Sequence, residues 1–354
     1  MDVSVDQLID LLSELISLRP VTEDAAQVNA AVGHLAGFLD RAGVFTREYA
    51  HGGRNVLYAA THESDTVDFL LNAHLDVVPA EDAMFAMTER EGCLCGRGTV
   101  DCLGNAALIA GLLAELNGQA SVGAIFSTDE ETGGETTAFM ASQPIRARKL
   151  ILVLDGGTLT VAQKGVLTVK LRAPGKACHA AEPWKGDNAL DRLLDGYAAV
   201  RTLFTQAREH DQWHDTLVAT RCQAGTVANR VPDSAEMTLN IRFTTVGDDQ
   251  RILRTLRERS GLEVEPQMQC SPVVIDPDHP EIRRLQANLA ASLGRDIPLE
   301  RLNGATDARH FAEHDAPVVI MGLPGRGAHS SDEAVQKAQF PLYLNALRKH
   351  LTDA

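Results

Sequence analysis

The sequence has no run of about 18 consecutive apolar residues, which is the length that a membrane-spanning helix needs. Its N-terminal segment, MDVSVDQLIDLLSEL, is acidic and amphipathic. It therefore lacks both the basic flank and the uninterrupted apolar stretch of a secretory signal peptide. From these absences we expect a cytoplasmic protein.

The 6 cysteines do not form a recognisable disulfide or metal-binding framework. Cys93 and Cys95 are separated by one residue, and no second close pair exists to complete a four-cysteine zinc site. Reduced, partly buried thiols are the expected state inside the cell. Cys102 and Cys178 each adjoin a residue considered below, but proximity alone assigns them no role.

Basic residues are scarce relative to acidic ones. The 33 lysines and arginines stand against 48 aspartates and glutamates, so the formal net charge is −15. Nucleic acids and anionic membranes are bound through basic surfaces, and the sequence therefore argues against either partner. With 354 residues, 44% of them hydrophobic, the chain can form one large domain or two of ordinary size.

In the first part of the chain, apolar residues follow helical and strand-like patterns in turn. Helical spacing predicts helices at 8–16 and 25–42, and a continuous apolar stretch predicts a buried helix at 105–116. Short β-like runs occur at 56–60, 68–73, 122–127 and 150–154. Nearly continuous apolar strands that alternate with helices favour an α/β fold with a largely parallel sheet flanked by helices.

The pattern changes after about residue 166. Strand, helix, strand, strand, helix and strand are predicted at 166–172, 188–207, 216–227, 235–244, 248–260 and 262–274. This β-α-β-β-α-β order is that of a ferredoxin-like module.

The chain returns to the first pattern near residue 277 and ends with a strand at 317–322 and a helix at 341–351. The sequence therefore predicts two domains. Their bounds are 1–165 together with 276–354 for the larger domain and 166–275 for the insertion.

Acidic residues and histidines lie just beyond several predicted strands. In chain order they are His74 and Asp76 (NAHLDVVP), Asp101 (GRGTVDCLGN), Glu130 and Glu131 (STDEETGG), Asp155 (LVLDGGT) and His329 (GLPGRGAHSSDE). Ligands of open α/β sheets collect at the carboxyl ends of the strands. Imidazoles and carboxylates there can hold a pair of divalent metals and supply a proton-transfer group. Amide hydrolysis by metal-activated water is therefore the leading hypothesis.

Each of these residues also has an ordinary structural interpretation. A hydrogen bond between His74 and a nearby aspartate could cap a strand, and Asp101 could be the N-cap of the next helix. Adjacent Glu130 and Glu131 repel each other unless a cation or proton compensates, although a solvated acidic turn is an alternative. A single loop histidine such as His329 carries no function by itself. The hypothesis depends on the combination.

In combination, several motifs resemble those of the co-catalytic di-zinc exopeptidases and deacylases: HLDVVP, GRGTVD, DEETGG, GKACHAAEPWKGDNAL, NRVPDSAE, GATDAR and GAH. That family includes glutamate carboxypeptidase, peptidase T, acetylornithine deacetylase, aminoacylase and succinyl-diaminopimelate desuccinylase. The resemblance covers essentially the whole chain. It implies a zinc-exopeptidase-like α/β domain with an inserted ferredoxin-like dimerisation (lid) domain.

The resemblance also implies a role for each matching residue. The implied metal ligands are His74 and Asp155 for one zinc ion, Glu131 and His329 for the other, and Asp101 as the bridge between them. Asp76 would orient His74, and Glu130 would be the general base and acid. Cobalt or manganese could replace zinc at ligands of this kind.

Residues of the inserted domain complete the implied site. His179 in GKACHA matches a histidine that reaches the active site of a partner subunit and polarises the scissile carbonyl, which implies a homodimer. Asn229 in ANRVPD and Arg242 in LNIRF match substrate-binding positions, where an arginine fork suits a carboxylate better than a lysine. Arg309 in TDAR is a further candidate for that task. An outward-facing strand residue is the alternative for Arg242.

The sequence departs from the common pattern of the family in two places. Leu103 occupies the position of a lysine in many members, and the third metal carboxylate occurs as DGG, as in peptidase T, in place of EPT. With GATDAR and GAH, the DGG segment favours a carboxypeptidase- or dipeptidase-like enzyme acting on a small peptide or N-acyl amino acid. An acetylornithine-type deacetylase is the alternative. A non-catalytic binding relative is the hypothesis from another class.

Overall fold

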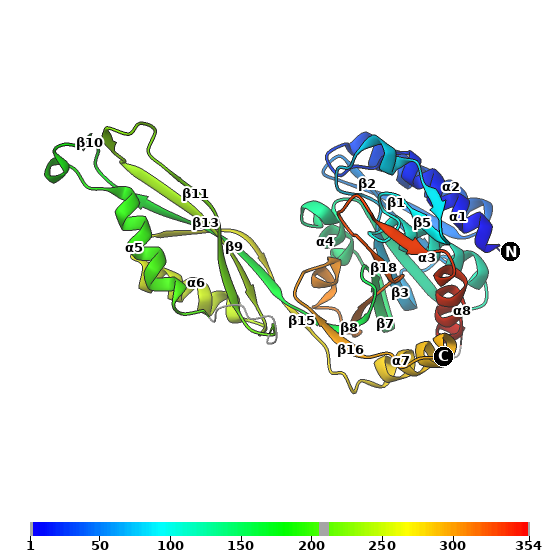
Figure 1. Ribbon diagram of the computed structural model, residues 1–354. Coiled ribbons are helices and arrows are strands. Elements are labelled where there is room, and N and C mark those ends of the chain that lie inside the picture. The colour runs from blue at the N-terminus through cyan, green and yellow to red at the C-terminus, as the bar shows by residue number, and fades with distance from the viewer. Residues whose placement is uncertain (1–2, 205–211, 353–354) are drawn as a thin grey trace. The chain divides into compact units, whose positions relative to one another are not determined.

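The computed structural model describes residues 3–204 and 212–352. The chain divides into two compact units, each with its own sheet and helices (Figure 1). The first comprises Met1–Val161, Ile275–Glu300 and Thr306–Ala354, and the second comprises Ala162–Val274 and Arg301–Ala305. Within the described ranges, no helix is both long and apolar enough to cross a bilayer.

The first unit is built on a central sheet with the strand order β1-β2-β6-β3-β7-β17-β8. The bounds are β1 Phe45–His51, β2 Arg54–Ala60, β3 Thr66–His74, β6 Val122–Ser127, β7 Arg146–Leu154, β8 Leu159–Gln163 and β17 Val318–Met321. The inner strands β6, β3, β7 and β17 are parallel, whereas β1, β2 and β8 are antiparallel to their neighbours. The predicted α/β fold with a parallel inner sheet is confirmed.

Helices flank this sheet. They are α1 Val5–Ser17, α2 Ala25–Arg41, α3 Leu103–Leu116, α4 Glu135–Ser142, α7 Pro280–Leu293 and α8 Gln339–Thr352. Helix α3 contacts strands β3 and β6 as well as helices α1 and α8. Almost all side chains of α3 are buried, so the helix presents no face to solvent. Its continuous apolar sequence is the one expected for such a helix.

A small second sheet of the first unit has the order β18-β19-β5-β4. Its strands are β4 Thr88–Arg90, β5 Cys93–Cys95, β18 Gly325–Arg326 and β19 Ala334–Gln336. None of these short strands was predicted from the sequence. Two loops leave this sheet: the segment 96–102 follows β5 and leads into α3, and the segment 327–333 connects β18 to β19.

The second unit contains an antiparallel sheet with the order β11-β13-β9-β14. Its elements are β9 Gly165–Pro174, β10 Cys178–His179, α5 Ala189–Arg201, β11 Thr216–Ala224, β12 Arg230–Val231, β13 Ser234–Phe243, α6 Asp248–Ser260 and β14 Glu263–Cys270. Apolar side chains of α5 and α6 pack on β9 and β13 in one core. The predicted β-α-β-β-α-β order is confirmed. The end of the helix predicted at 188–207 extends into residues that lie outside the described ranges.

The strand predicted at 262–274 is interrupted. It forms β14 and a separate short strand, β15 Val273–Val274. Pro272 stands between the two, and a proline has no N–H with which to continue a ladder of hydrogen bonds.

Candidate active site

Neighbouring strands of the central sheet position four of the predicted site residues. His74 is the last residue of β3, and Ser127, its register partner, is the last residue of β6. Glu130 and Glu131 follow β6, and Asp155 follows β7. Because β6, β3 and β7 are parallel neighbours, their carboxyl ends lie side by side, which brings these side chains to one edge of the sheet.

Asp101 and His329 reach this edge from the two loops of the small sheet. His74 Nε2 lies 2.9 Å from Asp101 Oδ1, and His329 Nε2 lies 3.1 Å from Asp101 Oδ2. His329 Nε2 is also 3.0 Å from Glu131 Oε2. Asp101 thus directs one carboxylate oxygen to each imidazole, an arrangement in which a carboxylate can bridge two cations. The N-cap of α3 is Cys102, so the alternative role for Asp101 is wrong.

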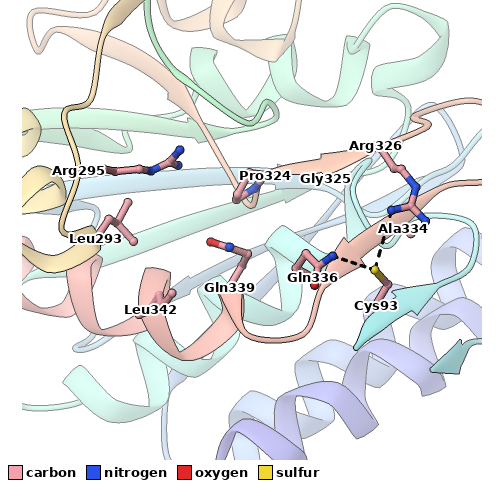
Figure 2. Close-up of a pocket in the computed structure, with 10 residues that line it drawn as sticks. All are labelled: Cys93, Leu293, Arg295, Pro324, Gly325, Arg326, Ala334, Gln336, Gln339 and Leu342. Atoms are coloured by element: carbon pink, nitrogen blue, oxygen red, sulfur yellow. Dashed lines mark hydrogen bonds between the residues drawn. The ribbon is translucent and has the colours of Figure 1, made fainter. Parts of the chain in front are cut away.

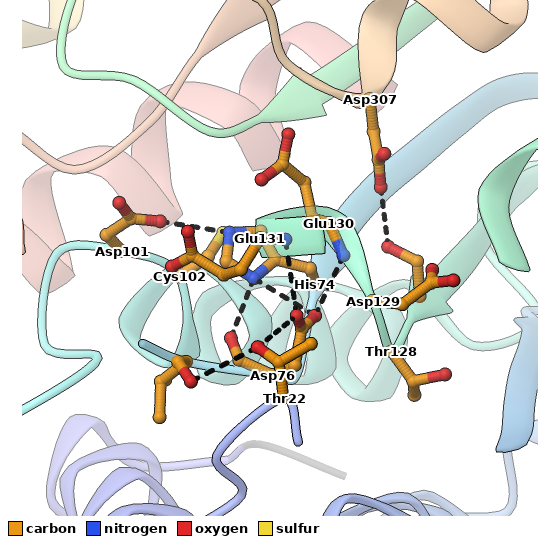
Figure 3. Close-up of polar contacts among 12 residues, drawn as sticks. Thr22, His74, Asp76, Asp101, Cys102, Thr128, Asp129, Glu130, Glu131 and Asp307 are labelled. Carbon is orange, nitrogen blue, oxygen red and sulfur yellow. Dashed lines mark hydrogen bonds and ion pairs between the residues drawn. The ribbon is translucent and has the colours of Figure 1, made fainter. Parts of the chain in front are cut away.

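Asp76 lies beneath this cluster and connects three segments of the chain (Figure 3). Its carboxylate accepts hydrogen bonds from Thr22 Oγ1 at 2.9 Å, Glu130 N at 3.1 Å and Glu131 N at 3.3 Å. His74 Nδ1 is 2.8 Å from the backbone oxygen of Asp76 and 3.5 Å from its carboxylate. Asp76 is therefore placed to orient His74, chiefly through its backbone oxygen. Thr22 was not found from the sequence, where nothing marks its hydroxyl.

Crowding and burial change the protonation of the carboxylates. Burial, followed by the charge of Asp101, raises the pKa of Asp155 to about 7. Burial, followed by the charge of Asp155, raises the pKa of Glu130 well above its ordinary value. The side chains of Glu130 and Glu131 are only 12% and 7% exposed, so the alternative of a solvated acidic turn is wrong. A cation bound beside these buried, crowded carboxylates would compensate their negative charge and favour their ionised forms.

The two imidazoles are shifted in the opposite sense. The hydrogen bond with Asp101, assisted by the charge of Glu131 and opposed by partial burial, raises the pKa of His329 to about 9. Burial would lower the pKa of His74, but its hydrogen bond with Asp101 and its proximity to Asp76 raise it well above its ordinary value. In the metal-free protein, the His329 imidazole therefore holds a proton at neutral pH that a bound cation would displace.

The spacing of the donor atoms fits metal ions. Ligand atoms of His74, Asp101 and Glu131 all lie within 4.8 Å of one another, and so do those of His74, Cys102 and Asp155. Nitrogen and oxygen donors at this spacing suit zinc, cobalt or manganese. Cys102 was not predicted to belong to this group. Its thiol is fully buried and donates to the backbone oxygen of Leu154 at 2.8 Å.

Arg309 is the predicted substrate-binding residue that joins the cluster in the first unit. Its Nη1 lies 3.4 Å from Glu130 Oε1, and its Nη2 lies 4.0 Å from Asp307 Oδ1. Asp307 is itself buried and accepts a hydrogen bond from Ser127 Oγ at 2.7 Å. Arg309 therefore faces the predicted general base directly, a contact that the sequence did not indicate.

The other three predicted residues belong to the second unit. His179 is exposed in β10, and the backbone N–H of Ala180 donates to Asn229 O at 2.9 Å, so His179 and Asn229 are neighbours. Arg242 is half-buried near the far end of β13, where its Nε donates to Asn240 Oδ1 at 3.1 Å. The strand from Ser234 to Arg242 spans roughly 26 Å at about 3.3 Å per residue. Arg242 therefore belongs to a different end of this unit from His179 and Asn229.

A cavity of about 500 Å³ lies elsewhere in the first unit (Figure 2). Two arginines, Arg295 and Arg326, line it together with residues of β18 and β19. Cys93 at its edge accepts a hydrogen bond from Gln336 Nε2 at 3.0 Å. Its ten lining residues include none of the predicted site residues, so the candidate active site rests on the cluster in Figure 3.

Comparisons with known proteins agree with this geometry. The model of the peptidase family M20/M25/M40 matches residues 70–353. Succinyl-diaminopimelate desuccinylase of Gluconacetobacter diazotrophicus is 30% identical, over 75% of this chain and 75% of the relative. A probable succinyl-diaminopimelate desuccinylase of Staphylococcus aureus is 24% identical, over 98% of this chain and 97% of the relative.

Solved structures share the fold over the full chain. Aminopeptidase PepT of Bacillus cereus superimposes with a TM-score of 0.81 at 18% identity, covering 100% of this chain and 99% of that one. The M20 family metallo-carboxypeptidase Sso-CP2 of Sulfolobus solfataricus gives a TM-score of 0.79 at 15% identity, covering 98% and 99%.

Proposed function

The chain belongs to the peptidase family M20/M25/M40 and is a metal-dependent hydrolase of amide bonds, and we propose that it acts as a di-zinc carboxypeptidase or dipeptidase on small peptides. The observation that carries this proposal is the position of Asp101 between two imidazoles, beside a buried Glu130. The DGG segment at Asp155 supports the peptidase branch.

The proposed metal ligands are the five side chains that converge at the sheet edge. His74 and Asp155 would hold one cation, Glu131 and His329 the other, and Asp101 would contact both. When bound, such cations supply the Lewis acidity that polarises an amide carbonyl and acidifies water. Zinc is proposed because its preferred ligands are present, and cobalt or manganese fit the same donors.

Glu130 is proposed to transfer the proton. Burial and nearby negative charge raise its pKa, which brings the carboxylate closer to the range in which a group both accepts and returns a proton near neutral pH. Glu130 would take a proton from the attacking water and return it to the leaving amine. Arg309, 3.4 Å away, can hold Glu130 in place or contact a substrate carboxylate, and Arg242 is proposed for the latter role.

Deacylation of an N-acyl amino acid is the second candidate, because two relatives are named as desuccinylases. We would measure kcat/KM of the zinc-loaded protein with dipeptides, tripeptides, and N-acetyl- and N-succinyl-amino acids. The peptidase proposal expects peptides to be the best substrates by at least tenfold. A preference for N-acyl amino acids would replace it with the deacylase, such as an acetylornithine-type deacetylase. No turnover with metal bound would indicate a non-catalytic relative.

Metal binding is expected to release protons, so the apparent zinc affinity is expected to fall as the pH is lowered. Since the pKa of His329 is about 9 in the metal-free protein, His329 is protonated at pH 8 and must lose its proton to bind a cation. The apparent zinc affinity should therefore fall at least tenfold per pH unit below 9. Asp155, with a pKa of about 7, makes the fall steeper below pH 7. Calorimetric titrations in buffers of different ionisation enthalpy count the protons, and a release of fewer than about 0.5 at pH 8 would contradict this.

We also propose a homodimer formed through the second unit. Strand β11 is at an edge of its sheet, and its residues 218–224 are exposed, so its backbone can pair with another strand. His179 and Asn229 at one end of the unit and Arg242 at the other could then serve different active sites. On this basis, 166–275 is the dimerisation (lid) domain, and 1–165 with 276–354 is the catalytic domain.

Mixing two inactive variants tests the shared site. Chains with His179→Ala and chains with Glu130→Gln should each have little activity. A mixture refolded from equal amounts should recover about one quarter of wild-type activity, because half of the dimers are mixed and each of these has one intact site out of two. Absence of recovery in proven heterodimers would show that His179 does not act in a partner's site.

A cytoplasmic location is proposed from the cysteines. All 6 are free in the structure, as expected for a reducing compartment.

A further inference from the structure

A buried glutamate, Glu333, connects the two loops that carry Asp101 and His329. It is 0% exposed and follows His329 by four residues, at the end of the loop between β18 and β19. Its carboxylate points at the other loop, 96–102, although the two segments are more than 230 residues apart in the sequence.

Glu333 binds the backbone of that loop along its length. Oε1 accepts hydrogen bonds from Val100 N at 2.9 Å and Asp101 N at 3.1 Å, and Oε2 accepts one from Gly98 N at 3.1 Å. The guanidinium of Arg97 also pairs with Oε2. At these positions of the loop, the carboxylate thus accepts the hydrogen bonds that a partner strand accepts in a β-sheet.

Arg97 makes the reverse contact, from the loop that carries Asp101 to the loop that carries His329. It is 3% exposed, and its Nη2 donates to Ser330 O at 3.3 Å, one residue after His329. The backbone oxygen of Glu333 in turn accepts a hydrogen bond from Gly96 N at 3.2 Å. Each loop therefore binds the other through both side chain and backbone.

The two loops also share the small sheet at their bases. β5, which leads into the Asp101 loop, pairs with β19, which follows Glu333. The pairing of β5 with β19 holds the two loops together where they leave the sheet. Glu333 joins them a second time, next to the proposed metal ligands. His329 itself adopts a positive φ of 64°, which costs energy for a residue other than glycine and requires support from its surroundings.

We propose that Glu333 is a positioning residue, which holds Asp101 and His329 at the separation that a pair of cations requires. This rests on the proposed function, since it assigns Glu333 to the assembly of that metal centre. With Glu333 in place, the loops are ordered before the metal arrives. Without it, metal binding must also order both loops, and affinity falls.

The variant Glu333→Gln tests this role. Glutamine keeps the size of the side chain but replaces one of the two carboxylate oxygens with an NH2 group. Because NH2 cannot accept a hydrogen bond, at least one loop amide loses its partner. The zinc affinity of the folded protein should fall 10- to 100-fold, measured by competition with a chromophoric chelator. Hydrogen exchange at the amides of Gly98, Val100 and Asp101 should be at least tenfold faster in the metal-free variant.

Asp249→Asn is the matched control. Asp249 is a buried carboxylate of the second unit that accepts hydrogen bonds from two glutamine side chains, and that unit contributes none of the proposed metal ligands. Its substitution tests whether loss of any buried carboxylate lowers zinc affinity through stability alone. We expect its zinc affinity to stay within twofold of the wild type.

Unchanged zinc affinity in Glu333→Gln would overturn the proposal, even if the variant were less stable. If that variant does not fold, Arg97→Lys retains a cation beside Glu333 but cannot contact both Glu333 and Ser330. It should lower zinc affinity at least threefold, and an unchanged affinity would again overturn the proposal. A wild type that binds no zinc would defeat the proposed function instead. Amide exchange in the metal-free proteins would then still decide whether Glu333 orders the loop.

Discussion

Replacing Glu130 with glutamine is expected to lower kcat at least 1000-fold while both cations remain bound. Glutamine has nearly the same shape but cannot accept the proton of the attacking water, and general base catalysis contributes about 10²- to 10⁴-fold. A 1000-fold loss corresponds to about 4 kcal/mol of transition-state stabilisation. Steady-state kinetics on the best substrate, with metal content measured on the same sample, checks both parts.

The control for this prediction is Glu135→Gln. Glu135 is an exposed acid in the first turn of α4, a few residues along the same segment, and its substitution should leave kcat within twofold. If Glu130→Gln kept more than a tenth of the activity, another group would be the base. If it lost activity together with a cation, Glu130 would be a ligand.

Replacing Asp101 with asparagine is expected to reduce bound zinc from two ions per chain to one or none. Both imidazoles of the cluster direct Nε2 at the Asp101 carboxylate, at 2.9 and 3.1 Å. A neutral amide offers one oxygen in place of two and no charge to compensate the cations. We expect the affinity for the second zinc ion to fall roughly 1000-fold and hydrolysis to become undetectable, consistent with the cost of removing a charged partner. Elemental analysis after dialysis gives the stoichiometry.

Asp129→Asn provides the comparison for this loss. Asp129, labelled in Figure 3, is also a buried carboxylate that follows β6, but it accepts a hydrogen bond at 3.0 Å from Thr136 N in the first turn of α4. This variant should keep two zinc ions. Retention of two tightly bound ions by Asp101→Asn would show that Asp101 does not bridge them.

Elements with a strong periodic signal could be predicted from the sequence. β6 and α6 have the expected bounds, Val122–Ser127 and Asp248–Ser260, because one is uniformly apolar and the other has a clear amphipathic pattern. β1 was missed because its sequence, FTREYAH, is mostly polar at an edge of the sheet. α7 was missed although Pro280 at its first turn and Ile282, Leu285 and Leu289 on its buried face are recognisable signals.

The same distinction applies to the residues of the candidate site. His74 and Asp155 could be placed because each ends or follows a buried strand, and parallel neighbours bring such positions together. Glu333, Arg97 and Thr22 could not, since their contacts join distant segments through side chains and loop amides, and no spacing in the sequence encodes them. The sequence predicts that Arg309 binds substrate, whereas its contact with Glu130 is visible only in the structure.

The chain leaves the first unit at Val161 and returns at Ile275, and Ile275 N donates a hydrogen bond to Val161 O at 3.0 Å. Entry and exit points of the insertion are thus direct neighbours on adjacent backbones. Further along the same pair of strands, Gln163 of β8 and Val273 of β15 are register partners, so a linker of about three residues between them would close a shortened chain as a hairpin. The intervening segment 164–272 can then be removed or exchanged while β8 and β15 remain in the central sheet.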